Sequence, residues 1–316
     1  MTFYQRIIEV DITLAQNTQT NQPSTFAGTG GANTVTLQGS RTSVKIRNSG
    51  APADATATVK IWGMTPSLMN QLSTLGLVFN LVPKNTLTVR AGQLVNGAPQ
   101  LATVYSGTVW AAYGDYSAQP DVPFIFECLA GAADAVISVP PSSFQGSASV
   151  ATMMSGFARQ MNLGFENNNV TATLKNAYFS GSAKTQAQKC ADAAGIEWGI
   201  YGNTLAIWPR GGNRNTPNIP EISVATGMVS YPAFTQQGII VKTVFNPLIS
   251  FGSLITVKSS LLAGISATNQ GSIFPTQWAV NKLDLDLDSL LPKGQWLSTV
   301  FAYNPGYSKG IIPPGA

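Results

Sequence analysis

Three aspartates near the C-terminus form the clearest group of residues in this sequence that could do chemistry. Asp284, Asp286 and Asp288 alternate with leucines in the run Leu283–Asp288. Side chains on a β-strand point alternately to its two faces, so a strand here places the three carboxylates together and the leucines opposite them. Clustered carboxylates can bind calcium, or act as a pair in hydrolysis.

The residues that follow this run argue against both kinds of chemistry. A calcium-binding EF-hand loop needs glycine at its sixth position and glutamate at its twelfth, where this sequence has Ser289 and Gln295. The other acidic residues are mostly isolated, which leaves few pairs for hydrolysis. The run therefore favours a half-buried strand with a solvated acidic face, and an interface with a basic partner is the main alternative.

The sequence contains no histidine at all. This absence excludes nucleophiles activated by histidine and zinc sites with histidine ligands. Two cysteines cannot supply a four-cysteine zinc site either. No glycine-rich phosphate loop with its lysine is present, and no G-x-G-x-x-G motif opens a predicted helix. We therefore expect no cofactor, no metal site and no enzymatic activity.

The N-terminus, the apolar stretches and the cysteines all favour a protein that folds in the cytosol. Arg6, Glu9 and Asp11 interrupt any apolar run at the N-terminus, so no secretory signal is predicted. No apolar stretch approaches the roughly 20 residues of a transmembrane helix, so we expect no membrane insertion. Cys128 and Cys190 lie in apolar patterns and are predicted to be buried free thiols.

The composition favours a β-rich protein that works in a permanent assembly. Hydrophobic residues make up 44% of the 316 residues and charged residues only 10%, against about 25% in a typical soluble domain. Chains rich in Thr, Ser and Gly with many β-branched residues form β-proteins. A surface with few charges is also easier to bury against another protein, because desolvating charges costs free energy.

The net charge of +4 is spread along the chain without a basic run or stripe. Tight nucleic-acid binding needs clustered cations that displace condensed counterions. Arg210 and Arg214 come nearest to a cluster, in a Gly/Asn-rich loop that is predicted to be a solvated turn. Specific DNA binding is therefore not expected.

Residues 1–135 are predicted to form a β-domain with one short helix. Thr65 can cap that helix, leucine and methionine repeat at helical spacing up to Leu75, and Gly76 is expected to end it. Asn96-Gly97 predicts a tight β-hairpin turn. The strand candidates lie at residues 7–14, 35–37, 43–47, 56–62, 86–91, 101–112 and 124–129.

Residues 136–212 are predicted to form a small α+β domain with two helices on a short sheet. The first helix has its apolar face from Val150 to Met161, with Ser147 or Ser149 as its cap and Gly164 as its end. The second helix is ended by Gly195. Residues 196–201 and 204–208 then form a hairpin about Gly202-Asn203.

Residues 213–316 return to strands and are predicted to form a second β-domain. Pro217 and Pro220 mark the linker that leads into it. The strand candidates lie at residues 238–245, 253–259, 278–288 and 296–303. The segment 80–90 of the first domain and the segment 246–258 of this one share a pattern, in which Asn and an apolar Pro-containing stretch lead through a turn into a strand. This likeness favours a β-domain that appears twice around an α+β insertion.

Three stretches of this sequence resemble the baseplate hub proteins of tailed, especially contractile-tailed, bacteriophages. The likeness covers mainly residues 190–300, and the first third of the chain matches only in being β-rich. The stretches are Ala194–Tyr201 with Leu205–Pro209, Thr226–Pro232 running through Gly238-Ile239 to Phe245–Ile249, and Trp278–Asp284 ending in Gly294-Gln295-Trp296.

The resemblance implies a mainly β fold in which two tail-tube-like β-domains flank the small two-helix α+β domain. It implies a homotrimer whose pseudo-six-fold ring joins a six-fold tail tube, or an adjacent tube-ring protein, to a three-fold spike protein among other baseplate subunits. Tape measure and DNA would pass through the ring without specific binding. The protein would then belong to the virion baseplate and be assembled in the host cytoplasm. In this setting Asp284, Asp286 and Asp288 would line the channel or a contact with the next ring.

Two other interpretations remain open from the sequence. A glycan-binding or adhesive tail subunit, of the distal-tail or fibre type, would share the Thr/Asn/Gly-rich strands, and its tryptophans would stack on sugars. The six tryptophans lie mostly in strand-like apolar contexts, which favours the hub interpretation. A wall hydrolase that uses two carboxylates is the third class, and the isolated acidic residues disfavour it.

Overall fold

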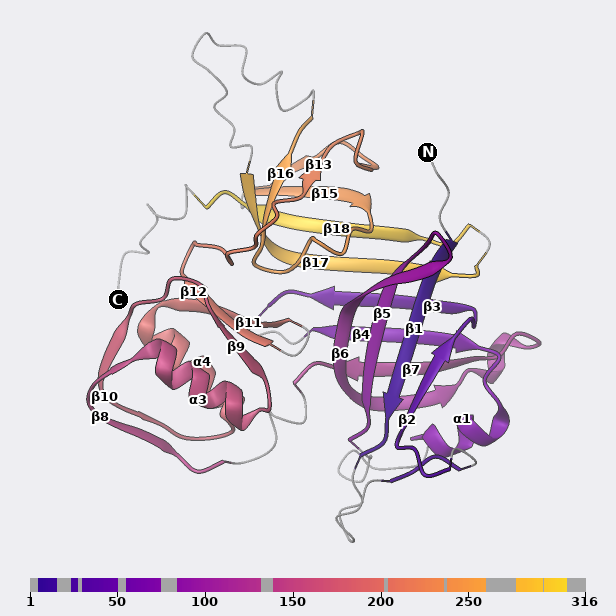
Figure 1. Cartoon of the computed structure of the whole chain (residues 1–316), viewed down its shortest axis with the longest axis horizontal. Helices are drawn as coiled ribbons and strands as arrows, with labels where there is room; N and C mark the ends of the chain where they lie inside the picture. Colours follow the sequence, from indigo (N-terminus) through magenta and orange to yellow (C-terminus); the bar gives the residue numbers. More distant parts are fainter. Residues whose placement is uncertain are drawn as a thin grey trace. The chain divides into compact units, whose positions relative to one another are not determined.

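The computed structural model describes residues 5–15, 24–27, 30–50, 55–74, 84–131, 139–201, 204–235, 238–259, 277–291 and 293–305. In this part of the chain the fold is mainly β with a small helical insertion, as predicted (Figure 1). The chain forms two compact units. The N-terminal unit comprises Met1–Arg47, Asp54–Ala133 and Leu285–Trp296, and the C-terminal unit comprises Asn48–Ala53, Asp134–Asp284 and Leu297–Ala316.

The N-terminal unit is built on an antiparallel sheet with the strand order β3-β4-β7-β6-β5-β1-β2. The strands are β1 (Gln5–Thr13), β2 (Thr34–Gln38), β3 (Thr42–Asn48), β4 (Thr56–Trp62), β5 (Thr86–Val95), β6 (Ala98–Gly114) and β7 (Pro123–Leu129), with a short 3₁₀ turn, η2 (Tyr116–Ala118), before β7. Alternate residues point to opposite faces, and on β4 this buries Ala57, Val59 and Ile61. The burial of one face of successive strands is the main source of stability in such a sheet.

Two local predictions in this unit have different outcomes. Asn96 and Gly97 both have positive φ and connect β5 to β6 with Val95 opposite Ala98, which confirms the tight hairpin. Helix α1 (Pro66–Leu72) begins after Thr65 as predicted, but it ends at Leu72 rather than near Gly76. Leu75 and Gly76 lie outside the described residues.

The early end of α1 has a tertiary cause. Ser73 is extended, and the N–H of Thr74 donates to the carbonyl of Ala112 in β6 over 2.8 Å. The Thr74 hydroxyl in turn accepts from the Ala112 N–H over 2.8 Å. This pairing with a distant strand replaces the hydrogen bonds of another helical turn.

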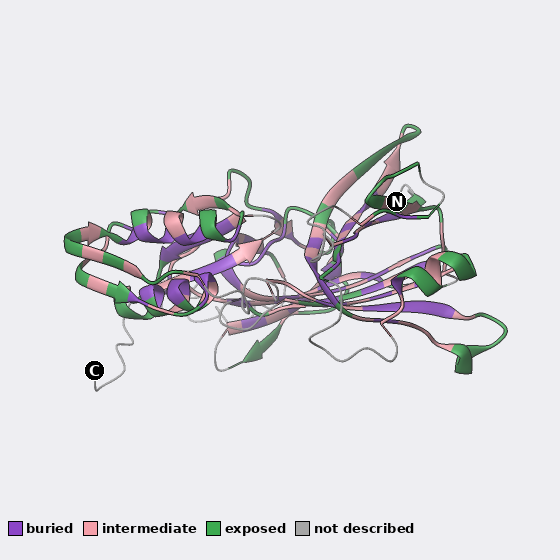
Figure 2. Cartoon of the chain, turned by 90° about the horizontal axis from the view of Figure 1, so that it is seen from below, coloured by how far each residue is buried: buried purple, intermediate pink, exposed green. Residues whose placement is uncertain are grey.

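The first part of the C-terminal unit, residues 139–209, is an α+β module with its own core. Its elements are β8 (Ser142–Ser149), α3 (Val150–Gln160), β9 (Gly164–Asn167), β10 (Thr173–Phe179), α4 (Ala183–Ala194), β11 (Ile196–Tyr201) and β12 (Thr204–Pro209). β8 pairs with β10, and β12 lies between β11 and β9. Buried faces of both helices meet in one apolar cluster that includes Met153, Phe157 and Cys190. Figure 2 shows each helix with buried positions on one side and exposed positions on the other.

The helix ends in this module were predicted in part. Gly195 ends α4 in the left-handed conformation, with φ of 63°, as expected. Gly164 does not end α3: the helix stops at Gln160, Asn162 takes the left-handed position, and Gly164 opens β9. Ser149 occupies the cap position of α3 without a side-chain hydrogen bond. The β11–β12 hairpin is present with Tyr201 opposite Thr204, while its turn residues 202–203 lie outside the described residues.

The second part of the C-terminal unit returns to strands. These are β13 (Glu221–Ile222), β14 (Ala233–Thr235), β15 (Gly238–Val244), β16 (Leu254–Val257), β17 (Gln277–Ser289) and β18 (Trp296–Tyr303). The order is β14-β15-β18-β17, and β16 pairs with both β13 and β17. All four strands predicted from the sequence in this region are present, and β18 has the predicted bounds. Residues 285–296, from the end of β17 to the start of β18, belong to the N-terminal unit.

The division into domains at 1–135, 136–212 and 213–316, and the suspected duplication, stay predictions. The α+β module and the strands after it belong to one compact unit, so their boundary at residue 212 is not a break between units. Residues 80–83, on which half of the duplication pattern rests, lie outside the described residues.

Candidate functional site

The predicted acidic face is present on β17, but its carboxylates are not simply solvated. The leucines of the run are buried and the aspartates are half-buried, which confirms the alternation. Asp286 Oδ1 lies 2.8 Å from Arg47 Nη2, and Asp284 Oδ2 lies 3.4 Å from Lys282 Nζ. Both carboxylates therefore have cationic neighbours within their own units.

Asp288 has a structural role in the connection from β17 to β18. Its Oδ2 accepts the backbone N–H of Gln295 over 2.7 Å, and its own N–H donates to the Gln295 carbonyl over 2.7 Å. The assignment of Asp284, Asp286 and Asp288 to a channel or to a contact with a neighbouring ring stays a prediction.

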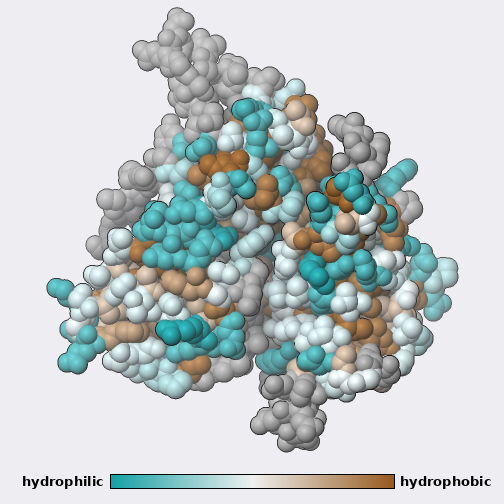
Figure 3. Space-filling view, viewed as in Figure 1, coloured by the Kyte–Doolittle hydropathy of each residue, from teal (hydrophilic) through white to brown (hydrophobic). Residues whose placement is uncertain are grey.

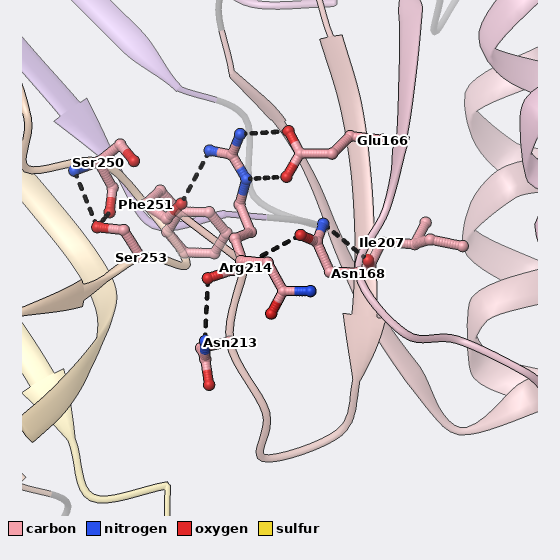
Figure 4. Close-up of polar contacts among 9 residues, drawn as sticks. Glu166, Asn168, Ile207, Asn213, Arg214, Ser250, Phe251 and Ser253 are labelled. Carbon is pink, nitrogen blue, oxygen red and sulfur yellow. Dashed lines mark hydrogen bonds and ion pairs between the residues drawn. The ribbon is translucent and has the colours of Figure 1, made fainter. Parts of the chain in front are cut away.

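Arg214 is the centre of a buried polar cluster in the C-terminal unit (Figure 4). Its Nη2 lies 2.6 Å from Glu166 Oε2, its Nε lies 3.1 Å from Glu166 Oε1, and its Nη1 donates to the Phe251 carbonyl over 3.5 Å. The residue is 9% exposed, and its guanidinium lies 5.4 Å from the centre of the Tyr201 ring. A planar guanidinium matches a carboxylate in this two-bond geometry.

The prediction that Arg214 lies in a solvated turn is therefore wrong. Gly and Asn around it do form a loop, but the Arg214 N–H donates to the Gly252 carbonyl over 2.7 Å, and the side chain pairs with Glu166 instead of facing water. Neither Glu166, 48 residues earlier, nor Phe251, 37 residues later, could be identified as its partner from the sequence.

The ion pair sets the protonation of Glu166. The hydrogen bonds from Arg214 hold the pKa of this carboxyl below its usual range, against the opposing effect of partial burial. Glu166 is therefore ionised at neutral pH and pairs with a cation that cannot be deprotonated.

Backbone and amide hydrogen bonds fix the linker around Arg214. Asn168 Oδ1 accepts the N–H of Asn215 over 2.7 Å, and Asn168 Nδ2 donates to the Ile207 carbonyl over 3.2 Å. The Tyr303 hydroxyl donates to the Gly212 carbonyl over 2.6 Å. The linker thus bonds to the α+β module on one side and to β18 on the other.

Aromatic packing completes this junction, which we define as Glu166, Asn168, Trp208, Arg214 and Phe251. The Trp208 and Phe251 rings lie 5.6 Å apart, and Trp208 Nε1 donates to Glu197 Oε2 over 2.8 Å. Trp208 comes from the α+β module and Phe251 from the loop before β16. The junction holds the two parts of the C-terminal unit in a fixed arrangement.

The N-terminal unit contains a pocket among its described residues. Its volume is about 250 Å³, and β1, the β2–β3 turn and Ser289-Leu290 line it. Arg6 in this pocket donates to the Gly294 carbonyl over 2.9 Å and lies 5.7 Å from the centre of the Trp296 ring. These contacts fold the connection between β17 and β18 onto β1.

The remaining sequence candidates have these positions. Cys128 and Cys190 are buried free thiols, as predicted. Four of the six tryptophans are at most 4% exposed, namely Trp198, Trp208, Trp278 and Trp296, while Trp110 is 44% exposed. Within the described ranges, no three His, Cys, Asp or Glu side chains are grouped to hold a metal ion, and no helix is long and apolar enough to cross a membrane.

Residues 19–270 match the family described as baseplate hub gp41. The chain belongs to this baseplate hub family. The match covers most of the chain, including the whole α+β module, and it confirms the resemblance to baseplate hubs. The third of the resembling stretches, residues 278–296, lies beyond the matched residues. The hub protein is therefore a structural component of a phage tail baseplate.

Solved structures with a similar fold are also tail proteins. The 43 kDa tail protein of prophage MuSo2 from Shewanella oneidensis aligns with a TM-score of 0.58 at 10% identity, over 96% of this chain and 97% of its own. A tail protein from Neisseria meningitidis MC58 aligns with a TM-score of 0.59 at 9% identity, over 96% and 98%. At these identities the likeness shows the fold alone.

A third structure comes from a secretion system. The E. coli c3393 protein, described as a component of the type VI secretion system with structural similarity to the T4 tail proteins gp27 and gp5, aligns with a TM-score of 0.51 at 9% identity. The alignment covers 84% of this chain and 74% of that protein. No curated protein sequence matches the hub protein.

Proposed function

We propose that three copies of this hub protein form a ring that adapts a six-fold tail tube to a three-fold spike. The observation that carries the proposal is the match of residues 19–270 to the baseplate hub family. In this role the chain is a structural subunit and has no catalytic activity of its own. Its partners are two further copies, the spike, the tube or an adjacent tube ring, and other baseplate subunits.

The physical character of the chain supports a permanent ring. Both units are rich in strands, and only 10% of residues are charged. Permanent interfaces are large and depleted of charge, because a desolvated charge without a partner is costly. A closed ring also covers sheet edges that would otherwise pair at random.

The ring is also proposed to be the channel for tape measure and DNA. The cations of the sequence are scattered, and the ion pairs of Arg47, Arg90 and Arg214 with carboxylates neutralise part of their charge. A channel wall with scattered and partly neutralised cations would not displace the counterions of DNA, so it would not hold the DNA in place. The fold likeness to c3393, itself described as similar to the T4 tail proteins gp27 and gp5, supports assembly with other tail components.

The native mass of the purified protein tests the proposal. We expect a species at three times the 33.3 kDa chain mass in light scattering across a range of concentrations, and a ring with three-fold symmetry in electron micrographs. A chain that stays monomeric at every concentration, and also when its spike and tube partners are added, would contradict the ring.

The acidic face gives a second test of the same proposal. Replacing Asp284, Asp286 and Asp288 together by Asn should reduce ring stacking and phage infectivity, because the face lines the channel or the contact with the next ring. Asp121→Asn, which removes a carboxylate with a 73% exposed side chain elsewhere, is the control. Circular dichroism checks that the triple variant is folded. Unchanged assembly and infectivity would show that the face has no such role.

A further inference from the structure

An outer edge segment, residues 227–235, runs antiparallel along β15 on the side opposite β18. The Val244 N–H donates to the Gly227 carbonyl over 2.9 Å, and the Val229 N–H donates to the Lys242 carbonyl over 2.8 Å. Further along, β14 pairs with β15 with Thr235 opposite Gly238. Among the described strands of the C-terminal unit, β14 in this segment stands at the end of the strand order, with β15 as its neighbour.

The pairing of the outer edge segment is interrupted by a bulge. Met228 lies opposite Thr243 and Ala233 lies opposite Ile240, so the segment has two more residues than β15 between these points. Pro232, which has no N–H to donate, lies within the bulge. Bulges and prolines on edge strands prevent indiscriminate strand pairing, so contact at this edge depends on side chains.

Large apolar side chains are exposed on and beside the outer edge segment. Val229 is 53% exposed, Tyr231 59% and Phe234 45%. Val224 lies three residues before the segment, Val244 is paired with its Gly227, and Leu248 follows four residues after Val244; these three are 73%, 40% and 52% exposed. No residue from 222 to 241 is charged. Figure 3 shows apolar residues, in brown, at the surface in the area where Figure 1 labels β13 and β15.

The size of this apolar surface is what a stable protein interface needs at its centre. Six large side chains about half exposed together present roughly 400–500 Å² of apolar area, within the range of roughly 300–600 Å² for the largest, often functional, patch of a monomer. A standard interface buries about 800 Å² on each partner, with an apolar centre depleted of charge. The outer edge segment and its neighbours would supply more than half of that area.

We propose that a second copy of this chain covers the outer edge segment and docks on Val224, Val229 and Tyr231. An apolar surface of this size needs a partner that is present whenever the chain folds, and a second copy always meets that condition. Interfaces between identical chains are also the most apolar class. The inference rests on the proposed ring and names the surface through which its copies meet.

Cross-linking identifies what covers the surface. A photoreactive amino acid replaces Tyr231, and as a control it replaces Tyr178, which is 63% exposed on β10. We expect the probe at Tyr231 alone to give a product of twice the 33.3 kDa chain mass, with peptides of the same chain at both ends. Cross-links from Tyr231 only within its own chain, for example to residues 260–276, or a stronger product from Tyr178, would overturn the proposal.

A charge variant tests the energetics of the same surface. Val224→Glu with Val229→Glu should raise the concentration at which the assembly half-dissociates by roughly a hundredfold, because two charges would have to be desolvated in an apolar contact. Tyr178→Glu should leave it unchanged. If the double variant assembled as tightly as the wild type, the proposed surface would be wrong and the proposed ring would stand. A wild-type chain that stays monomeric at every concentration, and also with its spike and tube partners, would contradict both.

Discussion

Replacing Glu166 by Gln is expected to lower the free energy of unfolding of the C-terminal unit by about 2–4 kcal/mol at neutral pH. The substitution keeps the shape of the side chain but leaves the side chain of Arg214, which is 11% exposed, without its counter-charge. A buried charge that loses its partner keeps its desolvation cost and loses the compensating attraction. Urea unfolding measures the loss, and hydrogen exchange of residues 164–215 serves as the readout for this region.

Glu221→Gln is the matched control for this prediction. Glu221 also pairs with a cation, since its Oε2 lies 2.6 Å from Lys258 Nζ, but the side chains are 38% and 63% exposed. Exposed pairs contribute little because water and salt screen them. We expect no resolvable change in this variant. Equal effects of the two substitutions would show that the burial of the Arg214 pair has no energetic importance.

The effect of Glu166→Gln should also depend on pH in a defined direction. Because Arg214 lowers the pKa of Glu166 in the folded state, the pair stabilises the fold above the unfolded pKa of about 4.3 and loses this contribution as pH falls through the folded pKa. The difference between the wild type and the variant should therefore be full at pH 7 and narrow below pH 4. A difference that does not change with pH would mean that packing, not charge, explains the loss.

The second large effect is expected for Gly50→Ala, at about 2–4 kcal/mol of destabilisation. Gly50 has φ of +71°, which costs an L-residue conformational energy, and a Cβ there would lie 1.9 Å from Cζ of Phe251. The added methyl group must therefore displace the Phe251 ring from its packing with Trp208. Thermal unfolding of the C-terminal unit measures the change.

Two further variants separate the backbone strain from the clash. Gly146 has nearly the same φ, +73°, with nothing within 4 Å of its Cβ position, so Gly146→Ala should show the strain alone, about 1–2 kcal/mol. Phe251→Leu removes the far end of the ring and should make Gly50→Ala less harmful than it is in the wild type. If Gly50→Ala and Gly146→Ala cost the same, the predicted collision with Phe251 is wrong.

The features that were predictable from the sequence are those that neighbouring residues decide. The alternation on β17 and β18, the Asn96-Gly97 turn and the end of α4 at Gly195 all follow from local periodicity or from the conformations that glycine and asparagine allow. The family could be identified from the patterns around residues 190–300 for the same reason.

The features that were missed depend on partners far away in the sequence. Helix α1 ends early because Thr74 pairs with Ala112, and Arg214 is buried because Glu166 and Phe251 surround it. An arginine in a Gly/Asn-rich loop has the same local sequence whether it is solvated or paired. The sequence holds only a weak signal for this pairing. Glu166 is the only acid between residues 135 and 191, and Glu197 is the only acid between residues 193 and 220. Each was therefore a candidate partner for a lone cation.

The burial of both thiols has a consequence for covalent chemistry. Burial raises the pKa of Cys128 far above its ordinary value and that of Cys190 to about 12, so neither forms the thiolate that oxidants, metals and alkylating reagents attack. Neither native thiol is therefore expected to form a disulfide when the folded protein moves from a reducing to an oxidising solution. It also follows that a cysteine introduced by Tyr231→Cys would be the only thiol of the folded protein that reacts with maleimides. Fluorophores attached there could report the meeting of two chains without removal of the native thiols.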